Sequence, residues 1–570
     1  MGTAFDYVIV GGGTSGVELL QCCFSAKRKL IRIKGCVLAS RLSDYLPQSS
    51  ILVIEAGLEQ DPRVKPSLGL VGQPAREIKW VFPSAPQKAL GDKTTDFTQG
   101  KVLGGTSSIN HQIWSRGAYG DFERWGSEVG DQRWSWEGLL PFFKKSETFI
   151  PGVDLQDKDL SALHGDSGPI KVSQVSSSGR PREYPLKEAM ARMYESVGCQ
   201  RANDMNSGDI LGYSEVTTSS YDGIRQWSAG NYPFGENVTI WTDVHATKIV
   251  FQGKRATGVE FLRSGNVKGE VSARREVIVS SGAQGSPKLL LLRQVPYGIG
   301  PGQELERHGI QKLADLPVGE NYSDHPMLAT YWNLEERGLS LGDVAMKTPE
   351  CDWTTGLPVD WMAFHRHDND SIVALAQSEL DALELERFKN KSRAHTESVI
   401  LYGHIDFTGK AGPAPTGSNI CVMNILVTPS SRGTVTLRST DPFDSAICDP
   451  NILSNESDRQ LFFSVVRLTS NALEQSIGPE YGLAEYGIDE SIKADYSDDA
   501  IMQRCMRIAR PVNHGSGTCA MGSVVDAECR VKGIEGLRVI DSSVIPLPLC
   551  GHYQAAVYAM AEQMAEVLSA

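Results

Sequence analysis

A glycine-rich turn near the start of the chain constrains the fold more than any other feature. The run Asp6–Val10 is short, apolar and β-branched, which is typical of a buried parallel strand. The next six residues have the spacing G-x-G-x-x-G. Between a strand and a helix, such glycines allow a tight turn, a close approach of the backbone to a pyrophosphate, and close helix packing. The sequence therefore predicts a Rossmann-type dinucleotide site formed by Gly11, Gly13, Thr14, Ser15 and Gly16.

A second apolar strand supplies the acidic residue that such a site needs. Ser50–Glu55 has the composition of a strand, and Glu55 stands at its carboxyl end. An acid at this position can accept hydrogen bonds from both hydroxyls of a ribose. The alternative is an ordinary strand–helix turn with a solvated acid at the end of a strand. The two features together favour the dinucleotide interpretation.

The spacing between these two motifs is anomalous. Glu55 lies 39 positions after Gly16, whereas about 20 is usual. The segment Val17–Gly35 carries five basic side chains and one acid, within a chain whose net charge is −13. Joining Gly16 directly to Cys36 would restore an ordinary strand–turn–helix transition. One hypothesis is that Val17–Gly35 is a translated short intron, and the alternative is a genuine surface insertion.

Charge and hydropathy argue against two classes of partner. A net charge of −13 is unfavourable for binding nucleic acid, because a phosphate backbone requires a basic face. No run reaches the roughly 18 apolar residues of a membrane-spanning helix. The first strand leaves no room for a secretory leader, so we expect a cytoplasmic protein, or a secreted one if the N-terminus is incomplete. The 11 cysteines form no C-x-x-C pair, and we expect no metal site.

Five further blocks follow in order along the chain, and they are Gly100–Asn110, Gly282–Leu290, Val318–Pro326, Asn513–Gly522 and Leu537–Pro546. Glycines and small hydroxyl residues in the first of them suit a backbone that closely approaches a flavin. Together the blocks resemble the signatures of the glucose–methanol–choline (GMC) oxidoreductases, a family of FAD-dependent enzymes. The resemblance is loose over residues 327–426, and Arg293–Tyr297 stands where the family usually has a single serine.

The resemblance implies an α/β fold with two domains. One is a Rossmann-like FAD-binding domain, and the other is a substrate-binding domain in which helices back a sheet. The FAD-binding domain is expected to be discontinuous and to comprise residues 1–150, 222–326 and 505–570. The substrate-binding domain is expected over residues 151–221 and 327–504.

The resemblance also implies where FAD is bound. The adenosine half is expected beside Gly11, Gly13, Gly16, Glu55 and the backbone of Ala246. The pyrophosphate and the flavin ring are expected beside Gly104, Thr106, Asn110, Asp541 and Gln554. Some members of the family bond the flavin covalently through a histidine, and Ile109 stands at that place here. We therefore expect FAD to be noncovalent.

Two histidines are the candidate catalytic residues. Oxidation of an alcohol removes a hydroxyl proton and a hydride, and histidine is suited to take the proton near neutral pH. His514 lies in a glycine-rich segment without helical periodicity, and His552 follows 38 positions later. In the GMC family these places hold a His–His or a His–Asn pair around the substrate hydroxyl. The alternative for each is a hydrogen-bonded structural residue.

The sequence thus predicts an enzyme that oxidises a mid-sized organic alcohol to a carbonyl by hydride transfer to flavin N5. The length of the anomalous segment suits a short fungal intron, which suggests a step in fungal secondary metabolism. One alternative is a lyase or cyclase of the same fold that contains FAD and performs no net redox chemistry. Another is a nonfunctional product of a defective transcript. The identity of the alcohol, the electron acceptor and the oligomeric state are not indicated.

Overall fold

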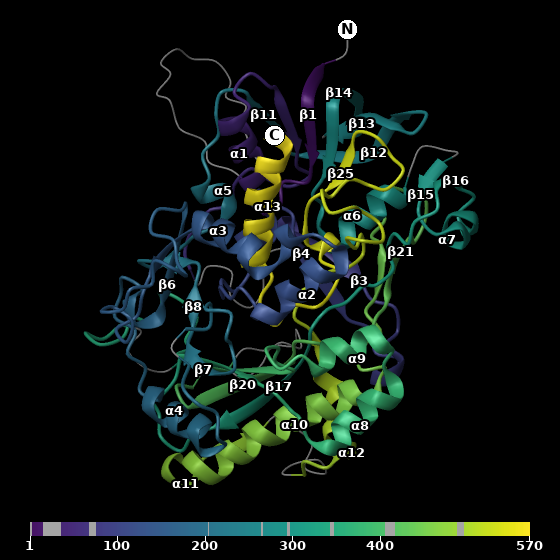
Figure 1. Ribbon diagram of the computed structural model, residues 1–570. Helices are drawn as coiled ribbons and strands as arrows, with labels where there is room; N and C mark the ends of the chain where they lie inside the picture. The colour runs from purple at the N-terminus through teal and green to yellow at the C-terminus, as the bar shows by residue number, and fades with distance from the viewer. Residues whose placement is uncertain are drawn as a thin grey trace.

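The computed structural model describes residues 3–14, 36–67, 76–202, 204–263, 266–292, 297–342, 347–404, 416–486 and 495–570. The anomalous segment Val17–Gly35 lies outside the described residues, and so do Ser15, Gly16 and residues 293–296. Figure 1 shows two large groups of elements, with β1 and β14 in the upper group and β17 and β20 in the lower group.

The first sheet is built around the strand that precedes the glycine turn. β1 (Ala4–Val10) lies between β2 (Ile51–Ile54) and β14 (Val267–Val279) and runs parallel to both. β11 (Val238–Trp241) adds a parallel strand beyond β2, and β25 (Leu537–Val539) pairs in parallel with the end of β14. Every residue of β2 is buried. Such burial explains why these strands are nearly continuous apolar runs rather than alternating ones.

The long strand β14 also carries the antiparallel part of this sheet. Its first half pairs with β13 (Arg255–Arg263), which pairs in turn with β12 (Val244–Gln252). The spatial order is β11-β2-β1-β14-β13-β12. The parallel strands, with a glycine turn at the end of β1, form a Rossmann-like arrangement. The predicted α/β fold class is therefore confirmed.

Helices pack on the first sheet and on one another. α1 (Val37–Tyr45) contacts α13 (Gln554–Ser569), and α13 also contacts α3 (Trp136–Ser146). Figure 1 shows α13 beside α1, so the C-terminal helix lies close to the start of the chain in space. Eleven consecutive residues of α13, from Ala555 to Ala565, are buried, which makes this helix a central element of the domain.

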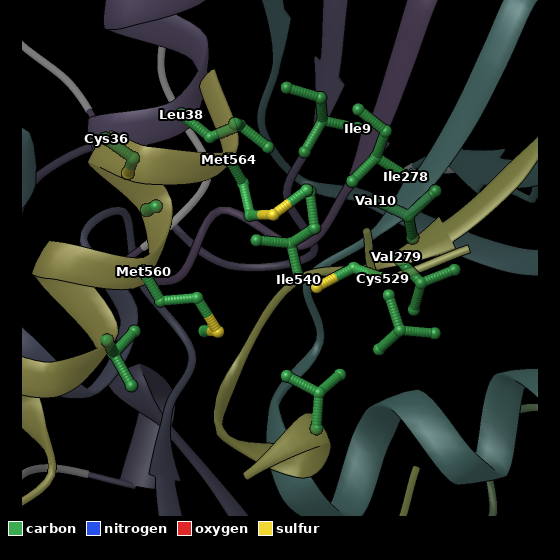
Figure 2. Close-up of a cluster of buried hydrophobic side chains, with 14 of the residues drawn as sticks. Ile9, Val10, Cys36, Leu38, Ile278, Val279, Cys529, Ile540, Met560 and Met564 are labelled. Carbon is green, nitrogen blue, oxygen red and sulfur yellow. The ribbon is translucent and has the colours of Figure 1, made fainter. Parts of the chain in front are cut away.

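Figure 2 shows the apolar core between these helices and the sheet. Leu38 of α1 and Met564 of α13 gather beside Ile9 of β1 and Ile278 of β14, and all four side chains are fully buried. Burial of a side chain of this size stabilises the fold by roughly 1.5–3 kcal/mol. This core fixes the carboxyl ends of the parallel strands, where the glycine turn lies.

The second sheet is antiparallel throughout. In spatial order its strands are β23 (Ala484–Tyr486), β17 (Pro326–Asn333), β20 (Asn419–Leu426), β19 (Thr396–Leu401), β18 (Trp361–His365) and β7 (Gly212–Glu215). The short strand β24 (Arg510–Pro511) also pairs with β17. All residues of β19 and β20 are buried, so both faces of this sheet are covered.

Helices back one face of the second sheet, as expected. α10 (Glu456–Ala472) packs on β19 and β20, and the Thr469 hydroxyl on this helix donates a hydrogen bond to Asn424 Oδ1 over 2.8 Å. α12 (Asp498–Ile508) contacts α10, and α4 (Lys187–Ser196) contacts β18. The residue boundaries between the two domains stay a prediction.

The remaining strands and α-helices lie outside the two large sheets. They are β3 (Lys79–Pro83), β4 (Asp96–Gly100), α2 (Tyr119–Val129), β5 (Glu147–Ile150), β6 (Ile170–Gln174), β8 (Thr217–Thr218), β9 (Ser220–Tyr221), β10 (Ile224–Arg225), α5 (Ser228–Asn231), α6 (Gly282–Leu291), β15 (Tyr297–Ile299), α7 (Gly302–Arg307), β16 (Gln311–Ala314), α8 (Asp370–Glu379), α9 (Ala382–Lys389), β21 (Thr434–Thr436), β22 (Ile447–Asp449) and α11 (Gly478–Tyr481). Among the described residues, no helix has the length and apolarity needed to cross a membrane.

Candidate active site

A cavity of about 1210 Å³ is lined by residues of both sheets. It exceeds the roughly 300–1,000 Å³ of ordinary small-molecule sites. At one end it is lined by Gly11, Gly13, Thr14, Glu55 and Ala246 of the first sheet and its turn. The lining also includes Thr106, Asn110, His514, Asp541, His552 and Gln554. The cavity therefore joins the predicted dinucleotide site to the predicted catalytic histidines.

The glycine turn and Glu55 form a tightly packed unit. Gly11 has a φ of 107°, and a Cβ atom there would lie 2.4 Å from the backbone oxygen of Ser280, so only glycine fits. The Glu55 carboxylate accepts hydrogen bonds from the backbone N–H groups of Gly12 and Gly57, each over 2.6 Å. Burial raises the pKa of Glu55. Each carboxylate oxygen retains a further acceptor site for a ligand hydroxyl.

A second glycine segment packs against the first. The Gly104 N–H donates to the carbonyl of Gly12 over 2.9 Å, and a Cβ atom on Gly105 would lie 2.5 Å from Gly13 Cα. Gly104 has a φ of 87° and supports this turn, while Thr106 lines the cavity. The backbone is thus exposed to the cavity without intervening side chains, which suits close contact with a phosphate.

The side chains of Asn110 and Gln554 are joined by a hydrogen bond. Asn110 Nδ2 donates to Gln554 Oε1 over 3.0 Å, and Gln554 Nε2 donates to the carbonyl of Ile113 over 2.7 Å. Arg225 Nη1 donates to Asn110 Oδ1 over 2.8 Å. Arg225 is buried, and burial lowers its pKa to about 9. These contacts fix the orientation of the Asn110 amide.

Asp541 connects the cavity to the start of α6. Its Oδ2 atom accepts the backbone N–H of Gly282 over 2.9 Å, and its Oδ1 atom accepts that of Ser543 over 2.8 Å. Burial raises the pKa of this carboxyl group. Asp541 therefore holds the N-terminus of α6 at the cavity wall.

The two candidate catalytic histidines lie together, with ring centroids 4.6 Å apart. His514 Nδ1 is 3.0 Å from His325 Nδ1, and His325 Nε2 is 3.2 Å from the Tyr553 hydroxyl. His552 Nε2 is 3.0 Å from Glu397 Oε1. Each of the two imidazoles therefore has one ring nitrogen engaged and one remaining.

The environment of His514, His325 and His111 disfavours their protonation. Burial, together with the neighbouring His552, His325 and His111, holds the pKa of His514 well below its ordinary value. Burial lowers the pKa of His325 to about 3 and that of His111 to about 4. A histidine with such a pKa is neutral at pH 7, which leaves it able to accept a proton.

The segment that carries His552 is anchored by a buried ion pair. Arg393 Nε donates to Asp121 Oδ1 over 2.6 Å, and Arg393 Nη2 donates to the carbonyl of Pro548 over 2.6 Å. The backbone N–H of Cys550 donates to Asp121 Oδ2 over 2.7 Å. These contacts fix the backbone two residues before His552.

Several residues at the site were missed by the sequence analysis. They are His111, Arg225, Glu397, His325 and Tyr553. Glu397 had one usable signal, since it is the charged residue of strand β19. His325 lies in the quoted block Val318–Pro326, but the block alone does not indicate its contact with His514.

In the described part of the chain, no group of three or more His, Cys, Asp or Glu side chains could hold a metal ion. His365 and His367 have the spacing H-x-H, which can bind a metal, but both contact hydroxyl groups. His365 Nε2 lies 2.8 Å from Ser398 Oγ, and His367 Nε2 lies 2.8 Å from Thr396 Oγ1.

A Rossmann-like sheet, a cavity that runs from its glycine turn, and a histidine pair at the far end define the class of FAD-binding oxidoreductases. Two family models, both described as GMC oxidoreductase, match residues 5–327 and 429–561. The chain therefore belongs to the GMC oxidoreductase family. The matches leave residues 328–428 uncovered, which agrees with the loose resemblance expected there.

Individual relatives resemble the chain over nearly its whole length. It is 32% identical to the GMC-type oxidoreductase acuG of Aspergillus aculeatus, with 100% of both chains covered. It is 31% identical to the oxygen-dependent choline dehydrogenase of Brucella canis, over 95% of this chain and 91% of that protein. A solved fungal aryl-alcohol oxidase superposes with a TM-score of 0.79 at 26% identity, over 100% of this chain and 99% of that one.

Proposed function

We propose that this protein oxidises an organic alcohol to a carbonyl compound by using noncovalently bound FAD. The observation that carries the proposal is that His514 and His552 face one cavity, which is continuous with the glycine turn and Glu55. An alcohol bound at the histidine end would place its hydroxyl beside a neutral base.

The residues of the cavity fit FAD. The nucleotide end combines bare glycine backbone with a buried acid at the end of β2, which suits a pyrophosphate and a ribose. Gly11, Gly13, Thr14 and Glu55 would hold this end. The flavin end would lie against Asn110, Asp541 and Gln554. When bound there, FAD supplies the acceptor for the hydride of the alcohol.

The proposal that FAD is noncovalent depends on the residue before Asn110. Ile109 lines the cavity and has no nucleophilic atom. Precipitation of the protein with acid should therefore release all the flavin into the supernatant.

His514 is the proposed base. Its Nδ1 atom is engaged by His325, so Nε2 is the nitrogen left for the substrate hydroxyl. For Nε2 to carry a lone pair, Nδ1 must carry the proton and donate to His325 Nδ1. His325 Nε2–H then donates to the Tyr553 oxygen, so two hydrogen bonds link His514, His325 and Tyr553 in series. With the protons so placed, His325 stabilises the tautomer of His514 that can accept the hydroxyl proton.

His552 is the proposed partner of His514 at the substrate hydroxyl. The carboxylate of Glu397 accepts a hydrogen bond from His552 Nε2–H, which orients the imidazole. Its Nδ1 atom remains for contact with the oxygen of the alcohol. Glu397 itself is 1% exposed, so its effect is exerted through His552.

The relatives support this reading. One is named a choline dehydrogenase and another an aryl-alcohol oxidase, and both names describe oxidation of an alcohol. The full-length likeness to a protein of Aspergillus aculeatus supports a fungal setting, for which a biosynthetic role is proposed.

The test is a product assay under anaerobic conditions. The purified flavoprotein is mixed with an excess of a candidate alcohol, and the carbonyl product is trapped as a hydrazone. We expect about one carbonyl per bound flavin, because the reduced cofactor has no acceptor. Many turnovers with the flavin still oxidised would instead identify a lyase or cyclase.

A further inference from the structure

The register of the second sheet shows which of its faces looks toward the histidines. Met327 of β17 lies opposite Ile425 of β20, which lies opposite Glu397 of β19. Directly opposed residues in antiparallel strands point to the same face. Because Glu397 reaches His552 over 3.0 Å, this face is the one that covers the histidine end of the cavity.

Residues two and four positions further along these strands point to the same face, because side chains alternate along each strand. Met423 lies opposite Val399, and Leu401 lies opposite Cys421. Met327, Met423, Ile425 and Leu401 all line the cavity, and so does Leu357 before β18. We call these five residues the apolar ceiling. Thioether and branched aliphatic side chains offer a substrate contact area without a polar anchor.

The charged side chain that lines the cavity on the face of the ceiling is cationic, whereas Glu397 on the same face is engaged by His552. Arg510 of β24 lies opposite Met327, so it belongs to the same face, and it also lines the cavity. Its charge contributes to the lowered pKa of His111. The carboxylate of Glu397 is bound to His552 and is not part of the lining.

Carboxylates that do line the cavity, among the residues described, lie elsewhere. Glu55 and Asp541 belong to the predicted FAD site, where backbone N–H groups bind them. Asp96 is exposed at the start of β4, opposite Pro83. A cationic group under the apolar ceiling would therefore lose its hydration without gaining a counterion.

We propose that the substrate is an alcohol with an apolar body that carries no positive charge. This inference rests on the proposed alcohol oxidation and adds the chemical class of the substrate. It separates this chain from the choline dehydrogenase that it resembles at 31% identity, because choline carries a quaternary ammonium group. Apolar area buried against the ceiling, rather than an ion pair, would supply the binding free energy.

The test compares two alcohols of the same shape and different charge. Choline and 3,3-dimethylbutan-1-ol differ only in the exchange of a quaternary nitrogen for a quaternary carbon. The holoenzyme is assayed with both, and with 4-tert-butylbenzyl alcohol and its 4-trimethylammonio counterpart. We expect kcat/KM to favour the neutral member of each pair by about 100-fold, as expected when an unpaired charge is buried. A ratio below ten in both pairs overturns the inference.

Binding is measured separately from turnover. The methyl ethers of choline and of 3,3-dimethylbutan-1-ol have no hydroxyl to oxidise, so their dissociation constants can be obtained by calorimetry. We expect the neutral ether to bind more tightly, and equal or tighter binding of the cationic ether contradicts the inference. If no alcohol of either charge is oxidised, the proposed function itself fails. If only cationic alcohols are oxidised, the function stands and the inference fails.

A matched pair of variants tests the ceiling directly. Met423→Glu adds a carboxylate next to Val399, whereas Met423→Gln adds the same bulk and polarity without charge. Relative to Met423→Gln, we expect Met423→Glu to reduce the preference for the neutral alcohol at least tenfold. An unchanged preference in a folded, flavin-loaded Met423→Glu protein contradicts the assignment of this face. If either variant fails to fold, the comparison of the two ethers on the unmodified protein decides.

Discussion

The imidazole of His514 titrates outside the ordinary range because it is buried beside other histidines. Its pKa is held well below 6.5. Protonation removes the lone pair that accepts the hydroxyl proton, so activity is retained above the folded-state pKa and lost as the pH falls through it. We predict that kcat/KM is flat from pH 7 to 8 and falls about tenfold per unit on an acid limb with its midpoint below 6.5. A midpoint at or above 6.5 would contradict the structure.

His325 is a positioning residue, since it acts on the reaction only through His514. His325→Phe retains a ring and removes both nitrogens, so nothing selects the tautomer of His514. We predict a loss of about 10- to 100-fold in kcat, the size expected for one buried hydrogen bond, with little change in KM. The acid limb should also move to higher pH, because the neighbouring His325 helps to lower the pKa of His514.

The control for this variant is Tyr553→Phe. It removes the hydroxyl that binds His325 Nε2 and leaves the contact between His325 and His514 in place. We expect a smaller loss of activity than for His325→Phe. If His325→Phe shows the pH profile of the unmodified enzyme, His325 serves only as a structural residue.

At the residue scale, the sequence predicted which residues form the site better than it predicted the contacts between them. Gly11, Glu55, His514 and His552 stand in motifs whose chemistry is local, and the structure places all four on one cavity. Glu397 escaped notice because its partner His552 lies 155 positions away. That pairing depends on the register of an antiparallel sheet, which short-range sequence patterns do not specify.

At the scale of elements, the loop before α13 is the feature that links catalysis to stability. Asp121 at the start of α2 accepts hydrogen bonds from Ala118, from Cys550 and from Arg393. Arg393 is 3% exposed. The ion pair therefore joins α2 to the segment between α9 and β19. Both partners also bind the backbone that leads to His552.

The variant Asp121→Asn tests this anchor. It keeps the size of the side chain and leaves the guanidinium of Arg393 buried without its counterion. Breaking such a pair costs about 3–5 kcal/mol, and we predict a decrease of that order in the free energy of unfolding measured in urea. As a control, Glu480→Gln removes the exposed ion pair with Arg192. This variant should leave the urea concentration at the midpoint of unfolding unchanged. Equal midpoints for both variants would contradict the anchoring role.

Element prediction succeeded where burial dictates a local pattern. The apolar runs at Asp6–Val10 and Ser50–Glu55 became β1 and β2, the parallel core of the first sheet. The double role of β14 could not be predicted, because its first half pairs with β13 and its second half with β1. That switch depends on strands brought together by the whole fold. The proposed insertion Val17–Gly35 lies outside the described residues and stays a hypothesis.

At the scale of the whole molecule, the cavity exists because two sheets of different construction face one another. The first contributes glycine backbone and Glu55, and the second contributes the apolar ceiling, while Glu397 of the second sheet binds His552. The block order along the chain predicted a flavoprotein of the GMC family, and the family models agree with it. The chemistry of the ceiling could not be predicted, since it lies in the part of the chain with the loosest resemblance.

The central claim is that an alcohol reduces the bound flavin while His514 takes the hydroxyl proton. The most direct measurement is the visible spectrum of the purified holoenzyme after anaerobic mixing with 4-isopropylbenzyl alcohol, in parallel with His514→Ala. We predict that the flavin band bleaches in the unmodified protein. In His514→Ala, we predict that it bleaches at least about 100-fold more slowly, as expected for loss of a general base. A band that stays oxidised while substrate is consumed, or equal rates in both proteins, would contradict the account.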